Sequence, residues 1–198
     1  MAISKVNLCN ISLSRLGHKK FITSLDPADT TVEGQLCDMY FEQTAAETLE
    51  MVDCRFARSR ARCTRLTETP AFGYDYAYQL PGNCLIVRKM VDSEGNDTTS
   101  KWTREGNTII TDLDACYIEY TKYVVEPDHW NAMFRRLFVL RLAADLSTGI
   151  TASDNRLDRI QNEMFEVIRL IKNNNAAESD QTGRKRGGNN AWDEAGTG

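Results

Sequence analysis

The chain has 198 residues, of which 41% are hydrophobic and 26% are charged. This length predicts one domain, with room for a small second lobe, and the hydrophobic share excludes a chain that is disordered throughout. The formal net charge of −4 argues against a protein that binds nucleic acid over much of its surface. No apolar run reaches the ~18 residues of a membrane-spanning helix, and residues 1–10 lack the apolar core of a signal peptide. We therefore expect a reducing cytosol, or a particle assembled in the cytoplasm.

In the first quarter of the chain, apolar residues recur with the period of an α-helix, in a pattern that predicts two helices. The first helix is expected to end near Gly17, because glycine readily adopts the left-handed conformation that follows many helices. The second is expected to begin near Asp29 or Thr30 and to end near Val52. Thr30 and Glu33 have the spacing of a capping box. Its predicted buried stripe consists of Val32, Leu36, Met39, Tyr40, Ala46, Leu49 and Val52.

The period then changes to the two-residue alternation of β-strands. Residues 56–66 read FARSRARCTRL, and residues 101–111 have the pattern of a short hairpin that turns at Gly106-Asn107. Further runs of β-branched and aromatic residues are separated by turns rich in Gly and Asn. They predict strands at Tyr76–Leu80, Cys84–Val91, Thr108–Thr111 and Tyr117–Val125. These strands predict a small antiparallel sheet inserted between helices.

After Glu126 the helical period returns, and Pro127 suits the first turn of a helix. That helix is expected to end near Gly149, and Ser153 or Asp154 is expected to cap the last helix. The broad stripe of the first helix comprises Trp130, Met133, Phe134, Leu137, Phe138, Leu140, Leu142 and Leu146. The narrower seam of the last helix comprises Leu157, Ile160, Met164, Val167 and Ile171.

From Asn173 the composition becomes rich in Asn and Gly, which predicts an extended arm without a core of its own. The arm contains the basic residues Arg184, Lys185 and Arg186, and one large apolar residue, Trp192. It is interpreted as a docking arm that a tryptophan anchors to a partner, as an idle solvated tail, or as a nuclear localisation signal. We favour the docking arm.

Together these elements predict an α+β fold that is mainly α. It is a bundle of about four helices with an inserted small antiparallel β-sheet and an extended C-terminal arm. The expected parts are the N-terminal helices at 1–55, the β region at 56–126, the C-terminal helices at 127–172 and the arm at 173–198. A bundle of this kind forms a rigid wedge from which the sheet protrudes.

The sequence predicts no catalytic residues, no cofactor and no metal site. The two histidines, His18 and His129, have no Ser or Cys partner in a nucleophile motif, and no phosphate-binding loop occurs. We therefore do not expect an enzyme; a small hydrolase is the least supported alternative. The six cysteines are widely and irregularly spaced, so we expect free thiols that pack as small apolar residues. They are Cys9, Cys37, Cys54, Cys63, Cys84 and Cys116.

Five arginines occur within eleven residues, with no acidic residue among them: Arg55, Arg58, Arg60, Arg62 and Arg65. Their forked guanidinium groups suit phosphate oxygens. They equally suit acidic residues of a neighbouring subunit, or a solvated strand face. Pairing with a neighbouring subunit is the favoured interpretation, because the acidic balance of the chain disfavours tight DNA binding.

Two stretches carry a family resemblance. The first contains Leu16-Gly17, the loop Ile22–Asp26, and Phe56-Ala57 followed by Arg60. The second, residues 70–84, reads PAFGYDYAYQLPGNC. Both resemble the head-to-tail adaptor family of tailed phages, also called tail tubular protein A in short-tailed phages. The second follows that family's pattern P-x-F-G-Y-x-Y-A-Y-x-L-P-x-D-C closely, except that Asn83 replaces the usual Asp.

The resemblance covers roughly residues 3–172. The sequence differs from the family pattern before Phe56, where Cys54 and Arg55 occupy the place of the usual Trp. The motif residues expected to have structural roles are Phe72, Gly73, Tyr76, Tyr78, Leu80 and Pro81.

The resemblance implies a structural protein that forms a ring, usually of twelve copies, under the portal protein at the head–tail junction of the virion. Such a ring extends the channel through which genomic DNA passes without specific binding, and it presents a platform for the tail nozzle or tail tube. The C-terminal arm typically reaches the portal, and no membrane is involved. The alternatives are a head-completion connector of a long-tailed phage and, in a different class, a nucleic-acid-binding module that uses Arg55–Arg65.

Overall fold

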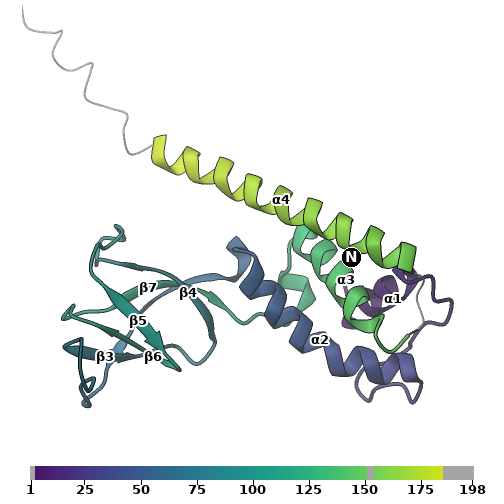
Figure 1. The fold of residues 1–198 in the computed structure, drawn as a ribbon, viewed down its shortest axis with the longest axis horizontal. Helices are drawn as coiled ribbons and strands as arrows, with labels where there is room; N and C mark the ends of the chain where they lie inside the picture. Colours follow the sequence, from purple (N-terminus) through teal and green to yellow (C-terminus); the bar gives the residue numbers. More distant parts are fainter. Residues whose placement is uncertain (1–2, 151–153, 185–198) are drawn as a thin grey trace, which may run out of the picture.

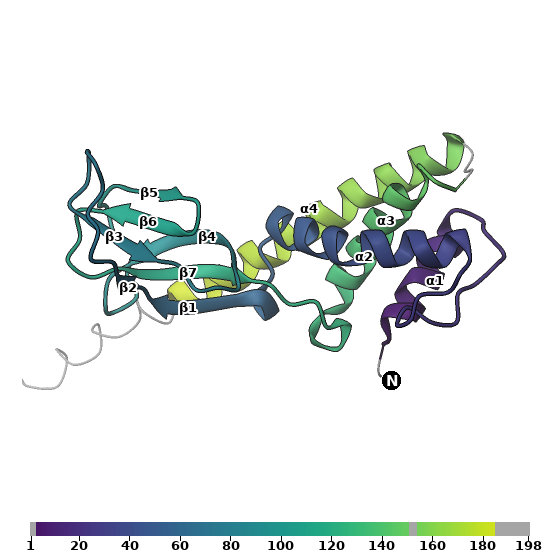
Figure 2. The same ribbon diagram turned by 90° about the horizontal axis from the view of Figure 1, so that it is seen from below.

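The computed structural model describes residues 3–150 and 154–184, and of residues 176–184 it describes the backbone alone. The molecule is elongated, with a helical part and a β part that lie end to end (Figures 1 and 2). The fold is α+β, as predicted. The four α-helices of the described residues are α1 (Lys5–Arg15), α2 (Val32–Met51), α3 (Ala132–Leu146) and α4 (Asp154–Arg184). Two short 3-10 turns are η1 (Arg55–Ala57) and η2 (Pro127–His129).

The C-terminal end of α1 follows the predicted signal, whereas the start of α2 does not. Gly17 follows the C-cap residue Leu16 and has a φ of 80°, the left-handed conformation expected after a helix end. Helix α2 is capped by Thr31, whose hydroxyl accepts a hydrogen bond from the backbone N–H of Gly34. The predicted cap at Thr30 is therefore wrong by one residue. The Asp29 carboxylate accepts hydrogen bonds from Thr23, which keeps this part of the loop out of the helix.

The buried face of α2 differs from the predicted stripe. Val32 and Met39 are 61% and 66% exposed, although both were expected in the core. The residues that α2 buries are Gly34, Cys37, Phe41, Thr44, Ala45, Thr48 and Leu49. Because apolar residues occur around much of the circumference of α2, the periodicity alone does not select one face.

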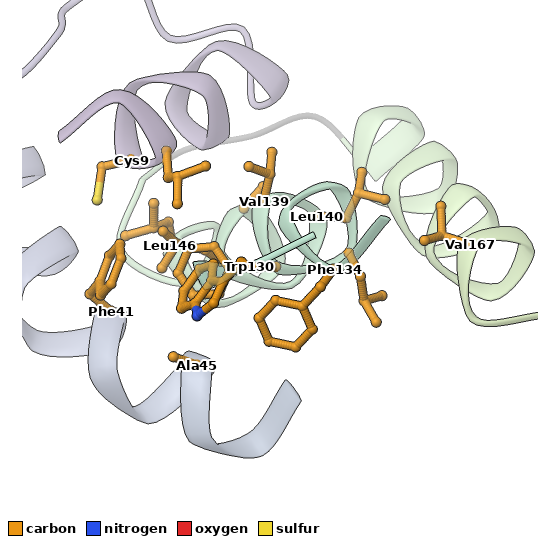
Figure 3. Close-up of a cluster of buried hydrophobic side chains, with 14 of the residues drawn as sticks. Cys9, Phe41, Ala45, Trp130, Phe134, Val139, Leu140, Leu146 and Val167 are labelled. Atoms are coloured by element: carbon orange, nitrogen blue, oxygen red, sulfur yellow. The ribbon is translucent and has the colours of Figure 1, made fainter. Parts of the chain in front are cut away.

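Helix α3 is the centre of the helical core, with α1, α2 and α4 packed around it. Trp130, just before α3, stacks on Phe41 and meets Phe134 edge to face (Figure 3). The predicted stripe is confirmed except at Met133, which is half-buried. The predicted first turn at Pro127 is wrong, since Pro127 begins η2 and Asn131 caps α3 by accepting a hydrogen bond from the N–H of Phe134.

Helix α4 is longer than predicted. Its expected seam packs on the core, with Ile160, Val167 and Ile171 buried, but the helix continues to Arg184 instead of ending at 172. The expected extended arm from Asn173 is thus helical over its first turns. Once the packed seam has formed the helix, each further residue adds a hydrogen bond without a new nucleation cost. Asn175 also anchors this section, because its side-chain amide donates to the backbone carbonyl of Asp53.

The β part contains seven strands in two antiparallel sheets, where one sheet was predicted. The strands are β1 (Arg58–Arg62), β2 (Thr64–Arg65), β3 (Tyr76–Gln79), β4 (Cys84–Val91), β5 (Trp102–Glu105), β6 (Thr108–Thr111) and β7 (Tyr117–Lys122). One sheet has the order β1-β7-β4 and the other β2-β3-β6-β5. The chain passes from one sheet to the other at Cys63, between β1 and β2. A second hydrophobic core, which includes Tyr78, Met90, Ile109 and Ile118, joins the sheets.

None of the helices in residues 3–150 and 154–184 combines the length and the apolar character that a membrane span requires.

Candidate functional site

Strand β1 places the central arginine of the predicted cluster over a buried carboxylate. In the antiparallel pairing of β1 with β7, Arg60 lies opposite Glu119. The Nε of Arg60 is 2.8 Å from Oε1 of Glu119, and the Nζ of Lys89 is 3.7 Å from Oε2. The Glu119 side chain is only 6% exposed. A buried carboxylate is costly without a cation, so Arg60 has a structural partner inside its own chain.

Two further arginines of the cluster have acidic partners in the chain. Arg58 lies 2.5 Å from the carboxylate of Asp53, and Arg65 lies 3.0 Å from that of Asp114. Arg65 and Asp114 also line one groove of about 330 Å³. A phosphate in this groove would meet the Asp114 carboxylate, which reduces the support for the phosphate interpretation.

Aromatic rings lie against two arginines of the cluster. The guanidinium carbon of Arg65 is 3.7 Å from the ring centroid of Tyr76, and that of Arg62 is 5.7 Å from the centroid of Tyr117. Arg55 lies in η1, just before β1. The structure thus brings the five predicted residues together along η1, β1 and β2. Pairing with a neighbouring subunit stays a prediction.

The pair of Arg60 and Glu119 makes a testable contribution to stability. Arg60→Ala is expected to lower the free energy of unfolding by about 1–3 kcal/mol, because Glu119 would keep only the more distant Lys89. Arg62→Ala is the matched control on the same strand and should cost less than Arg60→Ala, because it removes only the 5.7 Å contact with the Tyr117 ring. Urea unfolding followed by circular dichroism measures both. Equal effects of the two substitutions would contradict the role given to Glu119.

The tyrosine motif of residues 70–84 contributes mainly to the second core. Tyr78 is buried, and its hydroxyl donates a 2.7 Å hydrogen bond to the carbonyl of Leu113. Leu80 is also buried, and the carbonyl of Pro81 accepts a hydrogen bond from the N–H of Cys84 in the turn before β4.

The residues of the motif that precede Tyr78 are less buried. Gly73 has a φ of 84°, a left-handed conformation that favours glycine. Phe72 beside it is 87% exposed. Phe72 therefore lies outside both hydrophobic cores of the chain, and its expected structural role stays a prediction. Tyr76, in contrast, is half-buried beneath Arg65.

Arg88 joins the helical part to the β part, and the sequence pattern did not single it out. From β4, its Nε donates to the hydroxyl of Thr121 at 2.8 Å. Its Nη2 donates to the backbone carbonyls of Leu49, Glu50 and Val52 at the end of α2. The last carbonyls of a helix have no partner within it, so a cation is favourable there. The sequence signal that could have pointed to this role is a charged residue within the apolar run of β4.

The predicted tail residues lie at or beyond the edge of the described structure. Arg184 is the last residue of α4. Lys185, Arg186 and Trp192 lie outside the described residues, so the docking arm stays a prediction.

All six cysteines are free and buried, as predicted. Burial, together with the charge of Asp53, raises the pKa of the Cys54 thiol to about 12. A thiol–thiol hydrogen bond with Cys37, reinforced by burial, also raises the pKa of Cys9. Cys63 and Cys116 form a similar bond, which raises the pKa of Cys116. The same bond lowers the pKa of Cys63. The raised pKa values of Cys9, Cys54 and Cys116 make these three thiols packing groups rather than nucleophiles.

Alkylation tests the state of Cys54. Since the thiolate is the reactive form, a pKa raised from 9.0 to about 12 should slow alkylation near neutral pH about a thousandfold relative to an ordinary peptide thiol. Mass mapping after timed iodoacetamide treatment measures this rate. The denatured chain, in which all six thiols should react, is the control. Labelling of native Cys54 within tenfold of the peptide rate would contradict the expectation.

The histidines and acids of the described residues form no metal centre. Nε2 of His18 is 2.6 Å from a carboxylate oxygen of Glu33, and this pair ties the loop after α1 to the start of α2. Within residues 3–150 and 154–184, no group of three or more His, Cys, Asp or Glu is placed to hold a metal ion.

In comparisons with known proteins, the chain matches no protein-family model and no curated protein. The structure by itself defines an α+β protein in which a helical bundle carries a two-sheet β part.

Proposed function

We propose that the chain is a structural head-to-tail adaptor of a tailed phage, which forms a ring of about twelve copies under the portal protein. The observation that carries the proposal is the segment Pro70–Cys84, because its sequence follows the adaptor pattern at nearly every defined position. In this role the protein extends the DNA channel and presents a platform for the tail nozzle or tail tube. It acts at the head–tail junction of the virion and catalyses no reaction.

The shape of the molecule supports this proposal. The helical part and the β part form one elongated body, in which α2 and α4 flank α3 (Figures 1 and 2). Such a body can act as one wedge of a ring, because head-to-tail contacts between identical subunits close into a ring when the rotation fits. The bonds from Arg88 to the end of α2 connect the two parts, as a subunit that bears load between head and tail requires.

The charge distribution also suits a channel protein. The net charge of −4 repels phosphate, so DNA can pass without being held. The alternative of a nucleic-acid-binding module relied on the arginine cluster. Its support is reduced because Arg58, Arg60 and Arg65 have carboxylate partners within the chain.

A mixing experiment tests the proposal. The purified protein is combined with the portal ring from the same genome, and the masses of the complexes are read by native mass spectrometry. We expect stepwise addition up to a saturated ring. A chain that ends at Arg184 lacks Lys185, Arg186 and Trp192 but keeps α4, and it should lose this binding if residues 185–198 are the portal-docking arm.

The outcomes separate the alternatives. No association of the full-length chain with the portal ring would contradict the adaptor proposal. Binding of DNA by the isolated protein, with affinity that falls steeply as salt rises, would favour the nucleic-acid-binding module. A completed ring that binds a tail terminator instead of a nozzle would identify a head-completion connector of a long-tailed phage.

A further inference from the structure

Two helices of the bundle leave apolar side chains on opposite sides of the molecule. Both α2 and α4 pack on α3, and α3 lies between them (Figures 1 and 2). The outer side of each helix therefore faces away from the other. A subunit with two different contact faces on opposite sides has the geometry that head-to-tail association requires.

The outer face of α2 is apolar and acidic. Val32 and Met39 lie seven residues apart, so they share one side of the helix, and both are exposed. Between Val32 and Met51 the helix has five acidic residues and no basic residue. Two of the acids bond within the chain, Glu33 with His18 and Glu47 with Arg141.

The remaining acids give this face its negative charge. Glu42 and Glu50 lie on the same side as Met39, and both are exposed. Glu42 has a long ion pair of 3.7 Å with Lys5 and a hydrogen bond with the side chain of Tyr123, and the Glu42 side chain remains 64% exposed. Exposed pairs of this kind contribute little energy, so Glu42 remains available to a partner.

The outer side of α4 has an exposed phenylalanine followed by two cations, and the exposed Asp158 lies on the same side seven residues before that phenylalanine. Phe165 is 65% exposed, and Arg169 and Lys172 follow it at spacings of four and seven residues on the same side. Arg169 has an ion pair with Glu166 on the same helix, in which both side chains are well exposed. Glu163 does not offset these cations, because its carboxylate binds Arg15 and Arg136.

We propose that the outer face of α2 in one copy docks against the outer face of α4 in a second copy. Met39 and Val32 would cover Phe165, while Glu42 and Glu50 would face Arg169 and Lys172. Opposite charge on the two faces favours this pairing and disfavours contact between two copies of the same face. The proposal rests on the adaptor function and names the surface through which its ring closes.

Charge exchange between the faces tests the proposal. Glu42→Lys with Glu50→Lys, and separately Arg169→Glu with Lys172→Glu, should each reduce assembly on the portal ring at least tenfold. All four residues are exposed, so the substitutions should leave the circular dichroism spectrum unchanged. The chain that carries all four substitutions restores opposite charges across the contact and should recover most of the assembly. Native mass spectrometry counts the bound copies.

A matched control makes the same change in net charge at positions away from both faces. Glu68→Lys with Glu94→Lys alters two exposed acids of the β part and should assemble like the unmodified chain. If the unmodified chain assembles but the fourfold variant recovers no assembly, or if the two double variants assemble normally, the proposed contact is overturned and the adaptor function still stands. Failure of the unmodified chain to assemble on the portal would instead contradict the adaptor function itself.

Discussion

Trp130→Ala is expected to lower the free energy of unfolding by about 3–5 kcal/mol, the range for removing a large aromatic side chain from a core. Trp130 is 1% exposed and contacts three aromatic rings, those of Phe41, Phe134 and Phe138. Its indole N–H also donates to the carbonyl of Val124 at 2.8 Å. The substitution would leave a cavity where α2 and α3 meet and a partly buried carbonyl without its donor.

Denaturant unfolding followed by far-ultraviolet circular dichroism measures this loss. Trp130→Phe keeps an aromatic ring and should cost less than Trp130→Ala. Phe165→Ala, which removes an exposed aromatic side chain of α4, should change the free energy of unfolding by less than about 0.5 kcal/mol. A loss below about 1 kcal/mol for Trp130→Ala would show that this cluster is not the centre of the helical core.

Arg88→Met is expected to have the next largest effect, a loss of about 2–4 kcal/mol, because hydrogen bonds from a charged donor to partly buried carbonyls are among the stronger ones. The change removes the donor that the end of α2 shares with β7. It should also loosen the junction, so that the segment between α2 and β1 is cleaved faster by a protease.

The controls for Arg88 separate charge from geometry. Arg88→Lys keeps the positive charge but not the fork, and should recover part of the stability. Lys101→Met removes an exposed cation and should have little effect. If Arg88→Met left both the unfolding free energy and the protease pattern unchanged, Arg88 would not be the link between the two parts.

Strands were predictable where local signals are strong. The predicted bounds of Cys84–Val91 and Thr108–Thr111 agree with β4 and β6, and the hairpin turns at Gly106 with a φ of 57°. Alternating β-branched residues and glycine-containing turns act over a few neighbouring positions, so they can be read without the tertiary structure. The division into two sheets depends on the crossing at Cys63, for which no local turn signal exists.

Helix faces and ends were less predictable, because they depend on partners distant in the chain. The side of α2 that becomes buried is selected by α3, about a hundred residues later, as the bond between Thr44 and Asp145 illustrates. The end of α4 was placed too early, because a composition rich in Asn lowers helix propensity without preventing a packed helix from continuing.

The clustered arginines of the candidate site could be located from the sequence, but the carboxylates that pair with them could not. The spacing of Arg58, Arg60 and Arg62 placed them correctly on a strand. Their acidic partners were not predictable, since Glu119 lies 59 positions beyond Arg60 and meets it only through the register of β1 and β7. The same holds for Arg88, whose role appears only when the end of α2 lies beside β4.

Electron microscopy of the portal ring, imaged alone and after mixing with the full-length chain, tests the adaptor proposal most directly. The proposal predicts an added ring of density on one end of the portal, coaxial with its channel and leaving the channel open. Portal particles that are identical with and without the chain, or density bound away from the axis, would contradict it.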